Sequence, residues 1–577
     1  MIGAVRAGIQ SPDLIATLRA IVGRRHVLTD AAATRRYRTG YRTGSGAALA
    51  VVRPGSLVEL WRVASACVAA DVSLIMQASN TGLTGGSTPD GDDYPGGVVL
   101  VSTVRLDRLH LVDGGRQVVC LPGATLFQLE RALRPLGREP HSVIGSSCIG
   151  ASVLGGVCNN SGGALVQRGP AFTELALFAR VQPNGTLTLV NHLGIALGDE
   201  PETMLARLEA GDFSPADVAD DPGKRASAAA SYAGHVRAID AATPARFNAD
   251  PRYLHEASGC AGKLILFAVR LDTFPRDEDT TTFYIGTNDP AQLTALRRAV
   301  LGTFRHLPVA GEYMHRTAFD IAAVYGKDTF LAVQHLGTDR LPKLFAAKAW
   351  IDSVAARLGA RWAGLGDRLM QAASHLFPNP LPARMRDYRD RFEHHLILKM
   401  AGGGAAEARN WLTVHMAGEH GAFFECTADE AAKAFLHRFA VAGAAVRYRA
   451  VHRECVEDIV ALDIALPRNA EDWVETLSTD IDAAILHKIY YGHFFCHVFH
   501  QDYVVKKGVD PHALEQRMLA LLDRRGAEYP AEHNVGHLYR AKPALADFYR
   551  ALDPRNQLNP GIGQTSKVRF WGEGQPH

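Results

Sequence analysis

Residues 145–163 restrict the possible folds of this chain more than any other stretch, because almost no side chain among these nineteen residues is larger than leucine. Such a segment leaves the backbone open to a large, flat molecule. A second glycine-rich stretch, residues 77–87, follows the apolar run 74–76, which has the pattern of a buried strand. Its glycines let backbone amides approach a phosphate, and its hydroxyl groups donate further hydrogen bonds. Either loop alone is also typical of a tight turn, but two such loops after strand patterns predict a bound dinucleotide.

The spacing of these glycines disfavours two common nucleotide sites. The 77–87 loop matches neither the Gly-x-Gly-x-x-Gly pattern of nicotinamide-binding Rossmann folds nor the Gly-x-x-x-x-Gly-Lys-Ser/Thr pattern of Walker NTPases. Residues 259–263, Gly-Cys-Ala-Gly-Lys, superficially resemble a phosphate loop, but Leu264 stands where a magnesium-binding hydroxyl is required. An NAD-linked dehydrogenase and an NTPase therefore have little support.

Apolar runs and helix-capping patterns predict an α+β fold with mixed sheets for the first 270 residues. The strand patterns lie at 98–101, 118–121, 175–181, 187–190 and 264–269. Capping patterns begin helices at Ser11, Ser56 and Thr125. Residues 200–250 show little periodicity, so we expect a long surface insertion there, and a domain boundary near 273–275.

Charge is balanced over the whole chain, with 62 basic and 60 acidic residues, so no global field favours nucleic acid as a partner. Locally, residues 340–389 hold nine Lys and Arg against three Asp and Glu, interleaved with apolar side chains that include Trp350, Trp362 and Phe377. A second basic patch is formed by Lys433, Arg438, Arg447 and Arg449. This mixture is typical of a surface that lies on anionic lipid headgroups, and equally of a solvated helix whose apolar side faces a core.

Any membrane contact is expected to be peripheral, since no stretch has the roughly 18 consecutive apolar residues of a spanning helix. The residues before Ser11 lack the apolar core of a signal peptide, so we do not expect export. The eight cysteines are scattered without a Cys-x-x-Cys pair. This distribution argues against an iron–sulfur centre, a c-type haem or a structural zinc site and suits a reducing cytosol.

Further motifs carry a resemblance to a known family. They are Gly-Ser-Leu at 55–57, Arg-Glu-Pro-His-Ser at 138–142, Ser-Gly-Cys-Ala-Gly-Lys at 258–263, Gly-Glu-Tyr-Met-His-Arg at 311–316, Tyr-Tyr-Gly-His at 490–493 and Tyr-Pro-Ala-Glu-His-Asn-Val-Gly-His at 529–537. With the two glycine-rich loops, these motifs run nearly from end to end. The chain resembles the vanillyl-alcohol-oxidase type of FAD proteins, and within it the family of bacterial quinone-dependent D-lactate dehydrogenases.

The resemblance implies a two-subdomain FAD-binding domain of the PCMH type, an α/β cap domain that carries the substrate pocket, and an inserted helical, basic membrane-binding region. The implied boundaries are 1–270 and 521–577 for the FAD-binding domain, 271–310, 391–425 and 451–520 for the cap, and 311–390 and 426–450 for the membrane-binding region. With this resemblance, lipid contact becomes the favoured interpretation of residues 340–389.

The resemblance also implies which residues hold the FAD. The pyrophosphate is expected on Gln77, Ala78, Ser79, Asn80, Thr81, Gly82, Gly85 and Gly86. The flavin and ribityl chain are expected beside Ile144, Gly145, Gly150, Ala151, Asn160 and Ser161, with Ile265 on a neighbouring strand. Members of the wider family that bind flavin covalently often present a His from the first loop, or a Cys. Residues 77–87 contain neither, so we expect noncovalent FAD.

Oxidation of a 2-hydroxy acid needs a base for the hydroxyl proton and a cation for the carboxylate, while the flavin accepts the hydride. His533 is the candidate base, because Glu-His-Asn-Val-Gly at 532–536 resembles the Glu-His-Gly-x-Gly motif of related dehydrogenases, with Asn534 in place of Gly. A structural hydrogen-bonding role is the alternative for His533. Arg316 is the candidate for the carboxylate, since a guanidinium pairs both oxygens. A surface or inter-domain salt bridge is its alternative.

His493 is a third candidate, at strand spacing from His497. Related enzymes carry a pocket motif ending Gly-Asp-Gly-Asn-x-x-His, and its Gly-Asp-Gly-Asn core is missing here. A divalent metal held by these histidines, or by His394 and His395, is one alternative, and a pocket that they simply line is another. We assign no metal ligands from the sequence.

The resemblance implies FAD-dependent oxidation of D-lactate to pyruvate, with electrons passed to quinone by a peripheral protein on the cytoplasmic face of the inner membrane. One rival is a flavin dehydrogenase or oxidase for glycolate or D-2-hydroxyglutarate with another acceptor. A second rival is a non-catalytic membrane-surface protein. Lipid-dependent activity separates the acceptors, and a yellow purified protein excludes the second rival.

Overall fold

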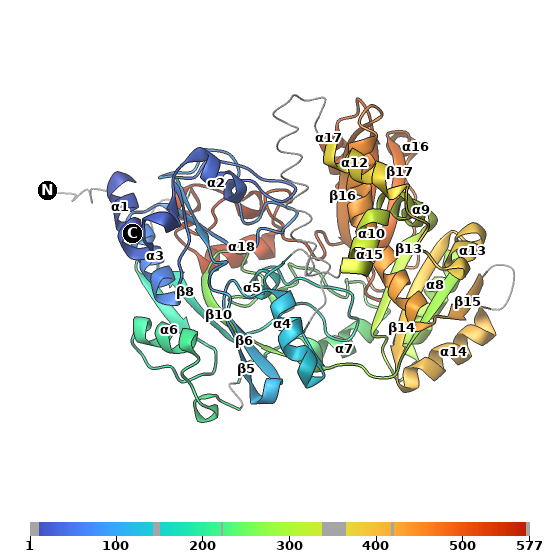
Figure 1. Ribbon diagram of the computed structural model, residues 1–577, viewed down its shortest axis with the longest axis horizontal. Coiled ribbons are helices and arrows are strands. Elements are labelled where there is room, and N and C mark those ends of the chain that lie inside the picture. Colours follow the sequence, from blue (N-terminus) through green and yellow to red (C-terminus); the bar gives the residue numbers. More distant parts are fainter. Residues whose placement is uncertain (1–10, 142–149, 221–222, 337–364, 417–420, 573–577) are drawn as a thin grey trace.

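The computed structural model describes residues 11–141, 150–220, 223–336, 365–416 and 421–572. Ile144 and Gly145 of the predicted second loop, and residues 340–364 of the basic stretch, lie outside the described residues. The chain forms two halves that lie side by side, and the C-terminal helix α18 lies among the N-terminal elements (Figure 1).

The first half contains a small four-stranded sheet with the order β1-β2-β4-β3. Its strands are β1 (Val27–Leu28), β2 (Ala50–Val52), β3 (Ser73–Gln77) and β4 (Val98–Ser102). β4 runs parallel to both β2 and β3, whereas β1 is antiparallel to β2. Every residue of β2 and β4 is buried, as expected for parallel strands covered on both faces.

A five-stranded antiparallel sheet, β5-β6-β10-β8-β9, packs against the first sheet. Its strands are β5 (Leu109–Val112), β6 (Gln117–Cys120), β8 (Ala176–Val181), β9 (Leu187–Asn191) and β10 (Ile265–Asp272). The helices of this half are α1 (Ser11–Val22), α2 (Ala31–Arg38), α3 (Leu57–Ala69), α4 (Leu126–Leu133), α5 (Val153–Cys158) and α6 (Pro201–Ala210). Helices α1, α3 and α6 share one core with both sheets, so the two sheets form a single unit. The predicted α+β class is confirmed.

The second half is built on a seven-stranded antiparallel sheet with the order β15-β12-β14-β13-β17-β18-β16. Its strands are β12 (Thr280–Thr287), β13 (Ala310–His315), β14 (His394–Ala401), β15 (Gly421–Glu425), β16 (Val456–Ala465), β17 (Ile485–His493) and β18 (Val498–Lys506). β11 (Phe274–Pro275) precedes this sheet in the chain and pairs with β7 (Arg138–Glu139) of the first half. This short two-stranded ladder connects the two halves.

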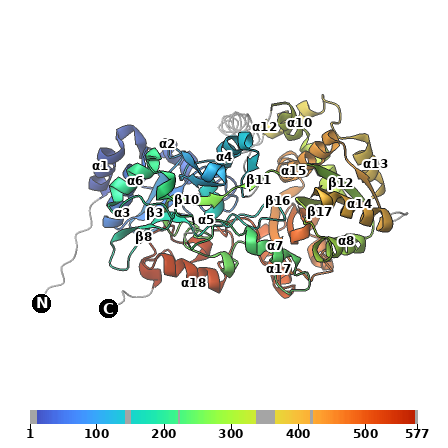
Figure 2. The same cartoon turned by 90° about the horizontal axis from the view of Figure 1, so that it is seen from below.

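Helices cover both faces of the seven-stranded sheet (Figure 2). The remaining helices are α7 (Ala229–Arg237), α8 (Pro290–Gly302), α9 (Arg316–Tyr325), α10 (Lys327–Leu336), α12 (Leu365–Ser374), α13 (Ala383–Arg391), α14 (Gly403–His415), α15 (Ala428–Val451), α16 (Thr479–Asp482), α17 (Pro511–Arg524) and α18 (Pro543–Leu552). Phe283 and Ile285 of β12 pack with α8 and α14, whereas Tyr284 between them packs with α9, α13 and α15. This alternation follows from the two-residue period of a strand.

The C-terminal segment returns to the first half beside β3. Leu74 donates its N–H to Gln557 O at 3.0 Å, and Asn559 donates to Leu74 O at 2.7 Å, so the segment pairs with β3 like a short parallel strand. The Asn559 side chain donates to Gly86 O and Ala261 O at 2.9 and 2.7 Å. The end of the chain thereby fixes the first glycine-rich loop.

Two expectations from the sequence need correction. Residues 200–250 are not a surface insertion: α6 packs in the core beside α3, and Tyr232 of α7 and Arg246 are 0% and 1% exposed. The range 311–390, predicted as a membrane-binding insertion, begins within β13, a central strand of the seven-stranded sheet. Among the helices that the structure describes, none combines the length and apolarity needed to cross a bilayer.

Candidate active site

In the first glycine-rich loop, the backbone amides of residues 78–87 donate no hydrogen bond to any residue that the structure describes. The Gln77 side chain fixes the loop instead, because its amide donates to Tyr37 O at 2.9 Å and to Ser87 O at 2.7 Å. At Gly82 an added Cβ would meet nothing within 4 Å. Amides without a partner among the described residues, beside the open space at Gly82, fit the pyrophosphate of FAD.

The second loop is described from Gly150 onward. Gly150 has φ +88°, and an added Cβ there would also meet nothing within 4 Å. Asn160 is buried, donates to Asn248 O and Tyr253 O, and has no partner for its own Oδ1 among the described residues. Small residues beside open space and a spare buried acceptor fit a flavin ring lying against this loop.

The other predicted flavin neighbours are buried. Ala151 and Ser161 are 5% and 9% exposed, and Ile265, the first residue of β10, is fully buried in the core between the two sheets. Their roles toward the cofactor stay predictions.

The predicted base lies on a C-terminal segment, residues 532–537, that packs directly on the first loop. His537 donates its N–H to Thr84 O at 3.0 Å. An added Cβ on Gly536, which has φ +54°, would lie 2.0 Å from the same carbonyl, so only glycine fits there. An added Cβ on Gly86 would lie 2.9 Å from the side-chain amide carbon of Asn534, the residue that departs from the related motif. This close packing brings His533 to the loop that fits the cofactor.

His493, at the end of β17, lies between two carboxylates. Its Nδ1 is 2.6 Å from Glu312 Oε1, and its Nε2 is 3.2 Å from Glu532 Oε2. Burial disfavours the charged imidazole, but the two carboxylates outweigh burial and raise the pKa of His493 to about 10. His493 is therefore an imidazolium at neutral pH and cannot accept a proton there.

Each of these two carboxylates also forms an ion pair with an arginine. Arg438 Nη2 lies 2.9 Å from Glu312 Oε2, and Arg246 Nη2 lies 2.6 Å from Glu532 Oε1. All of these side chains are at most 10% exposed. Two arginines and one imidazolium thus alternate with two carboxylates in a buried place. The positive groups among them suit an anionic substrate.

Asp463, near the end of β16, organises the neighbouring group. Its Oδ2 accepts the backbone N–H groups of Glu532 and His533 at 2.6 and 2.9 Å and lies 3.5 Å from His533 Nδ1. Its Oδ1 lies 3.1 Å from His500 Nδ1. Burial raises the pKa of Asp463, but His533 and His500 outweigh it and hold that pKa below its usual value. The carboxylate therefore orients two imidazoles at once.

Two sets of side chains bring three possible metal-ligand atoms within 4.8 Å of one another. They are His493, His500 and Glu532, and Asp463, His500 and His533. In the first set, the outer ring nitrogens of the two histidines face Glu312 and Asp463. Carboxylates in such positions orient metal-bound histidines, so this set has the chemistry to hold a divalent cation as well as a proton.

The other histidines considered for a metal do not converge. His394 and His395 are consecutive in β14 and point to opposite faces, where they contact the hydroxyls of Tyr313 and Tyr284 at 2.8 and 3.3 Å. His497 is buried with its Nδ1 3.1 Å from Pro467 O. The alternative of a metal shared by His394 and His395 is therefore wrong.

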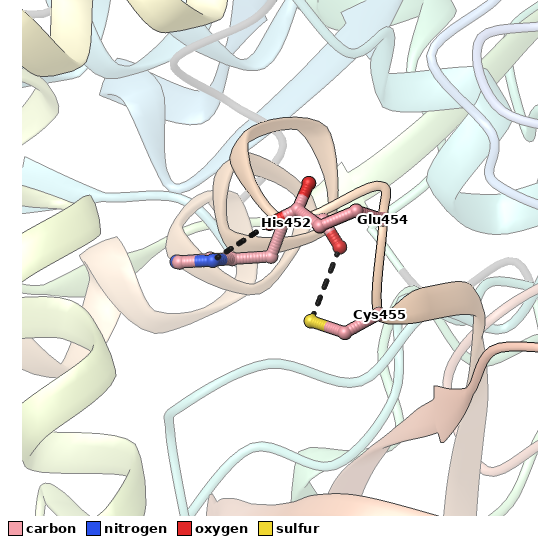
Figure 3. A group of neighbouring side chains, drawn as sticks. All are labelled: His452, Glu454 and Cys455. Carbon is pink, nitrogen blue, oxygen red and sulfur yellow. Dashed lines mark hydrogen bonds and ion pairs between the residues drawn. The ribbon is translucent and has the colours of Figure 1, made fainter.

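A further group of ligand-type side chains, His452, Glu454 and Cys455, lies just after α15 (Figure 3). His452 Nδ1 lies 3.8 Å from Glu454 Oε1, and the Cys455 thiol donates to His452 O at 3.5 Å. His452 Nε2 also contacts the Tyr325 hydroxyl at 2.6 Å. These contacts close the end of the helix and are separate from the His493 group.

The sequence matches known families over both halves. A profile described as an FAD binding domain matches residues 48–190, and one described as D-lactate dehydrogenase, membrane binding, matches residues 282–571. The quinone-dependent D-lactate dehydrogenase of Escherichia coli (strain K12) is 59% identical over 96% of this chain and 97% of that protein. The enzyme of the same name from Haemophilus influenzae is 56% identical over 97% of this chain and 99% of that protein.

This chain belongs to the quinone-dependent D-lactate dehydrogenase family. The family resemblance read from the motifs is thus confirmed, as is the FAD-binding domain.

Solved structures place this family member in the predicted fold class. p-Cresol methylhydroxylase with bound substrate aligns with a TM-score of 0.58 at 11% identity, over 97% of this chain and 98% of that one. 4-Ethylphenol oxidase from Gulosibacter chungangensis aligns with a TM-score of 0.55 at 13% identity, over 97% and 98%. The PCMH-type arrangement is confirmed as a fold.

Arg316, the predicted carboxylate partner, starts α9 at the end of β13. Its Nη2 lies 3.2 Å from Glu393 Oε1, and 32% of its side chain is exposed. Glu312 is four residues earlier on β13, which is roughly 13 Å along a strand. In the structure, Arg316 therefore makes the surface ion pair that was its alternative interpretation.

Sequence reasoning singled out His493 and His533 but missed most of the side chains around them. Those residues are Glu312, Asp463, His500, Arg246 and Arg438. A signal was present for Asp463 and Arg438, because a charged residue inside an otherwise apolar stretch is unusual. Arg246 gave no such signal, since it lies in a mixed polar stretch.

Proposed function

We propose that this chain oxidises D-lactate to pyruvate with FAD and passes the electrons to a membrane quinone. The observation that carries the proposal is the contact between residues 532–537 and the first glycine-rich loop. It brings a histidine, a buried cationic group and a cofactor-type loop together in a member of the quinone-dependent D-lactate dehydrogenase family.

His533 is proposed as the base that removes the hydroxyl proton. Its ring is 37% exposed, so a substrate can reach it, and Asp463 faces its Nδ1. With Nδ1 directed at the carboxylate, Nε2 is the nitrogen that takes the proton. When bound, FAD supplies the acceptor for the hydride from the α-carbon.

His493 is proposed as a donor rather than a base. As an imidazolium held by Glu312 and Glu532, it keeps positive charge beside the substrate oxygens. This charge offsets the lactate carboxylate and stabilises the alkoxide character that develops as the hydroxyl proton leaves. Arg316 remains a weaker candidate for the carboxylate because it already pairs with Glu393.

FAD is proposed to bind noncovalently. The free amides of residues 78–87 support binding of the pyrophosphate by hydrogen bonds, and residues 77–87 include no His or Cys that could form a bond to the flavin. Heat or acid treatment should therefore release all of the flavin from the protein.

Membrane contact is proposed at helix α12 and the residues just after it. Leu369 of α12 and Leu376 and Phe377 just after it are 55%, 85% and 53% exposed. These exposed apolar side chains belong to the sequence range 340–389, which holds nine basic residues, and this combination supports binding to anionic lipid. We place the protein as a peripheral protein on the cytoplasmic face of the inner membrane.

The proposal is tested by adding D-lactate or L-lactate anaerobically to the purified protein and following flavin absorbance. Bleaching by the D isomer alone supports it. Bleaching by glycolate or D-2-hydroxyglutarate in preference to D-lactate supports the alternative substrate class. Protein without flavin contradicts the assignment of both loops.

A further inference from the structure

Helix α15 carries two arginines that the sequence predicts as part of a basic, lipid-facing patch. Arg438 and Arg447 are instead buried, at 8% and 6% exposed, because each pairs with carboxylates inside the fold. The prediction of a second basic patch is therefore wrong for these two residues.

Arg438 reaches the active site from this helix. Its Nη2 lies 2.9 Å from Glu312 Oε2, while Glu312 Oε1 lies 2.6 Å from His493 Nδ1. The guanidinium carbon also lies 4.6 Å from the centre of the Tyr491 ring, two residues before His493 and on the same face of β17. One oxygen of Glu312 is thus held by α15 and the other by the imidazole.

We propose that Arg438 is a positioning residue for the oxidation. By holding Glu312 in place, it keeps the His493 ring directed at Glu532. The inference rests on the function proposed above. Helix α15 lies within the region matched by the membrane-binding family profile. The proposal assigns this helix a part in the active site.

The contacts around Glu312 come from separate elements. Arg438 of α15 lies 2.9 Å from Glu312 Oε2, and His493 of β17 lies 2.6 Å from Glu312 Oε1. Glu532 and Arg246 lie beyond His493. Removing the Arg438 side chain takes away the contact that fixes Oε2, so the Glu312 carboxylate is free to turn away from the His493 ring.

Arg447 provides a matched control. It lies on the same helix, is as deeply buried as Arg438, and pairs with Asp328 and Asp367 of α10 and α12 instead of with the sheet. Arg447→Met and Arg438→Met each remove one buried guanidinium from α15. Only Arg438→Met removes a contact of Glu312, the residue that contacts His493.

The experiment compares Arg438→Met, Arg438→Lys and Arg447→Met as flavin-loaded proteins. The limiting rate of anaerobic flavin reduction by D-lactate and the D-lactate concentration that gives half of that rate are measured separately. For Arg438→Met we expect the limiting rate to fall at least about tenfold, because a misplaced group beside the reacting atoms costs up to about 100-fold, and the half-saturating concentration to change less. Arg438→Lys should restore most of the wild-type rate, and Arg447→Met should keep it. Equal limiting rates for Arg438→Met and Arg447→Met would overturn the proposal.

A second comparison covers the case in which Arg438→Met does not fold. Glu312→Gln and the double variant Glu312→Gln/Arg438→Met leave no carboxylate on β13 for Arg438 to hold. If Arg438 acts through Glu312, the two proteins should reduce flavin at equal limiting rates. A further loss in the double variant would contradict the proposal. If wild-type flavin is not bleached by D-lactate at all, the proposed function fails rather than the role of Arg438.

Discussion

Replacing His533 by glutamine removes an imidazole ring but keeps the backbone contacts of this residue. The His533 N–H donates to Asp463 at 2.9 Å, and the His533 carbonyl accepts from the Asn248 side chain. The side chain is also partly exposed, so no apolar core is opened. We therefore expect a folded protein that still binds FAD.

The size of the expected effect follows from the role of the ring. A positioned general base contributes about 10²- to 10⁴-fold to a proton transfer. This range corresponds to about 3 to 5 kcal/mol of activation free energy. The ring of His500 is stacked 5.9 Å from that of His533, but it is less open to a substrate, because 15% of its side chain is exposed against 37% for His533.

The assay is anaerobic stopped-flow reduction of the bound flavin by D-lactate. His533→Gln should slow this reduction by at least about 100-fold while the flavin content stays that of the wild type. A rate within about threefold of wild type would refute the assignment of His533 as the base. A loss of flavin would instead show that the ring is needed to hold the 532–537 segment on the loop.

Three further predictions concern Asp463, the possible metal ligands and the exposed apolar residues after α12. Asp463→Asn removes the carboxylate that two imidazoles and two backbone amides face. It should therefore lower the free energy of unfolding by about 3 to 5 kcal/mol near neutral pH, as measured by denaturant unfolding. Since the pKa of Asp463 is lowered in the fold, the stabilisation is present at neutral pH and is lost as the pH falls through that value, so the difference between variant and wild type should shrink in acid. Dialysis against a chelator should leave the rate of flavin reduction unchanged, because the His493 group already carries positive charge. A loss of rate that Mn²⁺ or Zn²⁺ restores would contradict this prediction and favour a cation on His493, His500 and Glu532. Leu376→Asp with Phe377→Asp should weaken binding to anionic vesicles at least tenfold in a flotation assay and spare reduction by D-lactate, whereas unchanged binding would exclude this surface as the lipid contact.

The sequence predicted the elements that depend on local pattern. Apolar runs located β3, β4, β6, β8, β9 and β10 to within a few residues, because a buried strand must be apolar along its length. Glycine-rich spacing identified the first loop, because free backbone amides require residues without bulky side chains. These features are encoded by neighbouring residues.

The active-site partners depend on contacts that no local pattern encodes. Arg246 and Glu532 are 286 positions apart, and Glu312 and His493 are 181 apart, yet each pair makes a direct contact. A charged residue in a polar stretch, such as Arg246, looks the same whether it is solvated or buried. Arg438 and Arg447 were wrongly predicted to face lipid because their carboxylate partners come from β13, α10 and α12, which are distant in the sequence.

The central claim is transfer of electrons from D-lactate to a membrane quinone, and one measurement tests it directly. Flavin-loaded protein is added anaerobically to anionic vesicles that contain a quinone, and pyruvate and quinol are quantified after D-lactate is supplied. The account predicts equal amounts of pyruvate and quinol with D-lactate, none with L-lactate, and little turnover without vesicles. Pyruvate that forms without quinol, or equal turnover with the two isomers, would contradict it.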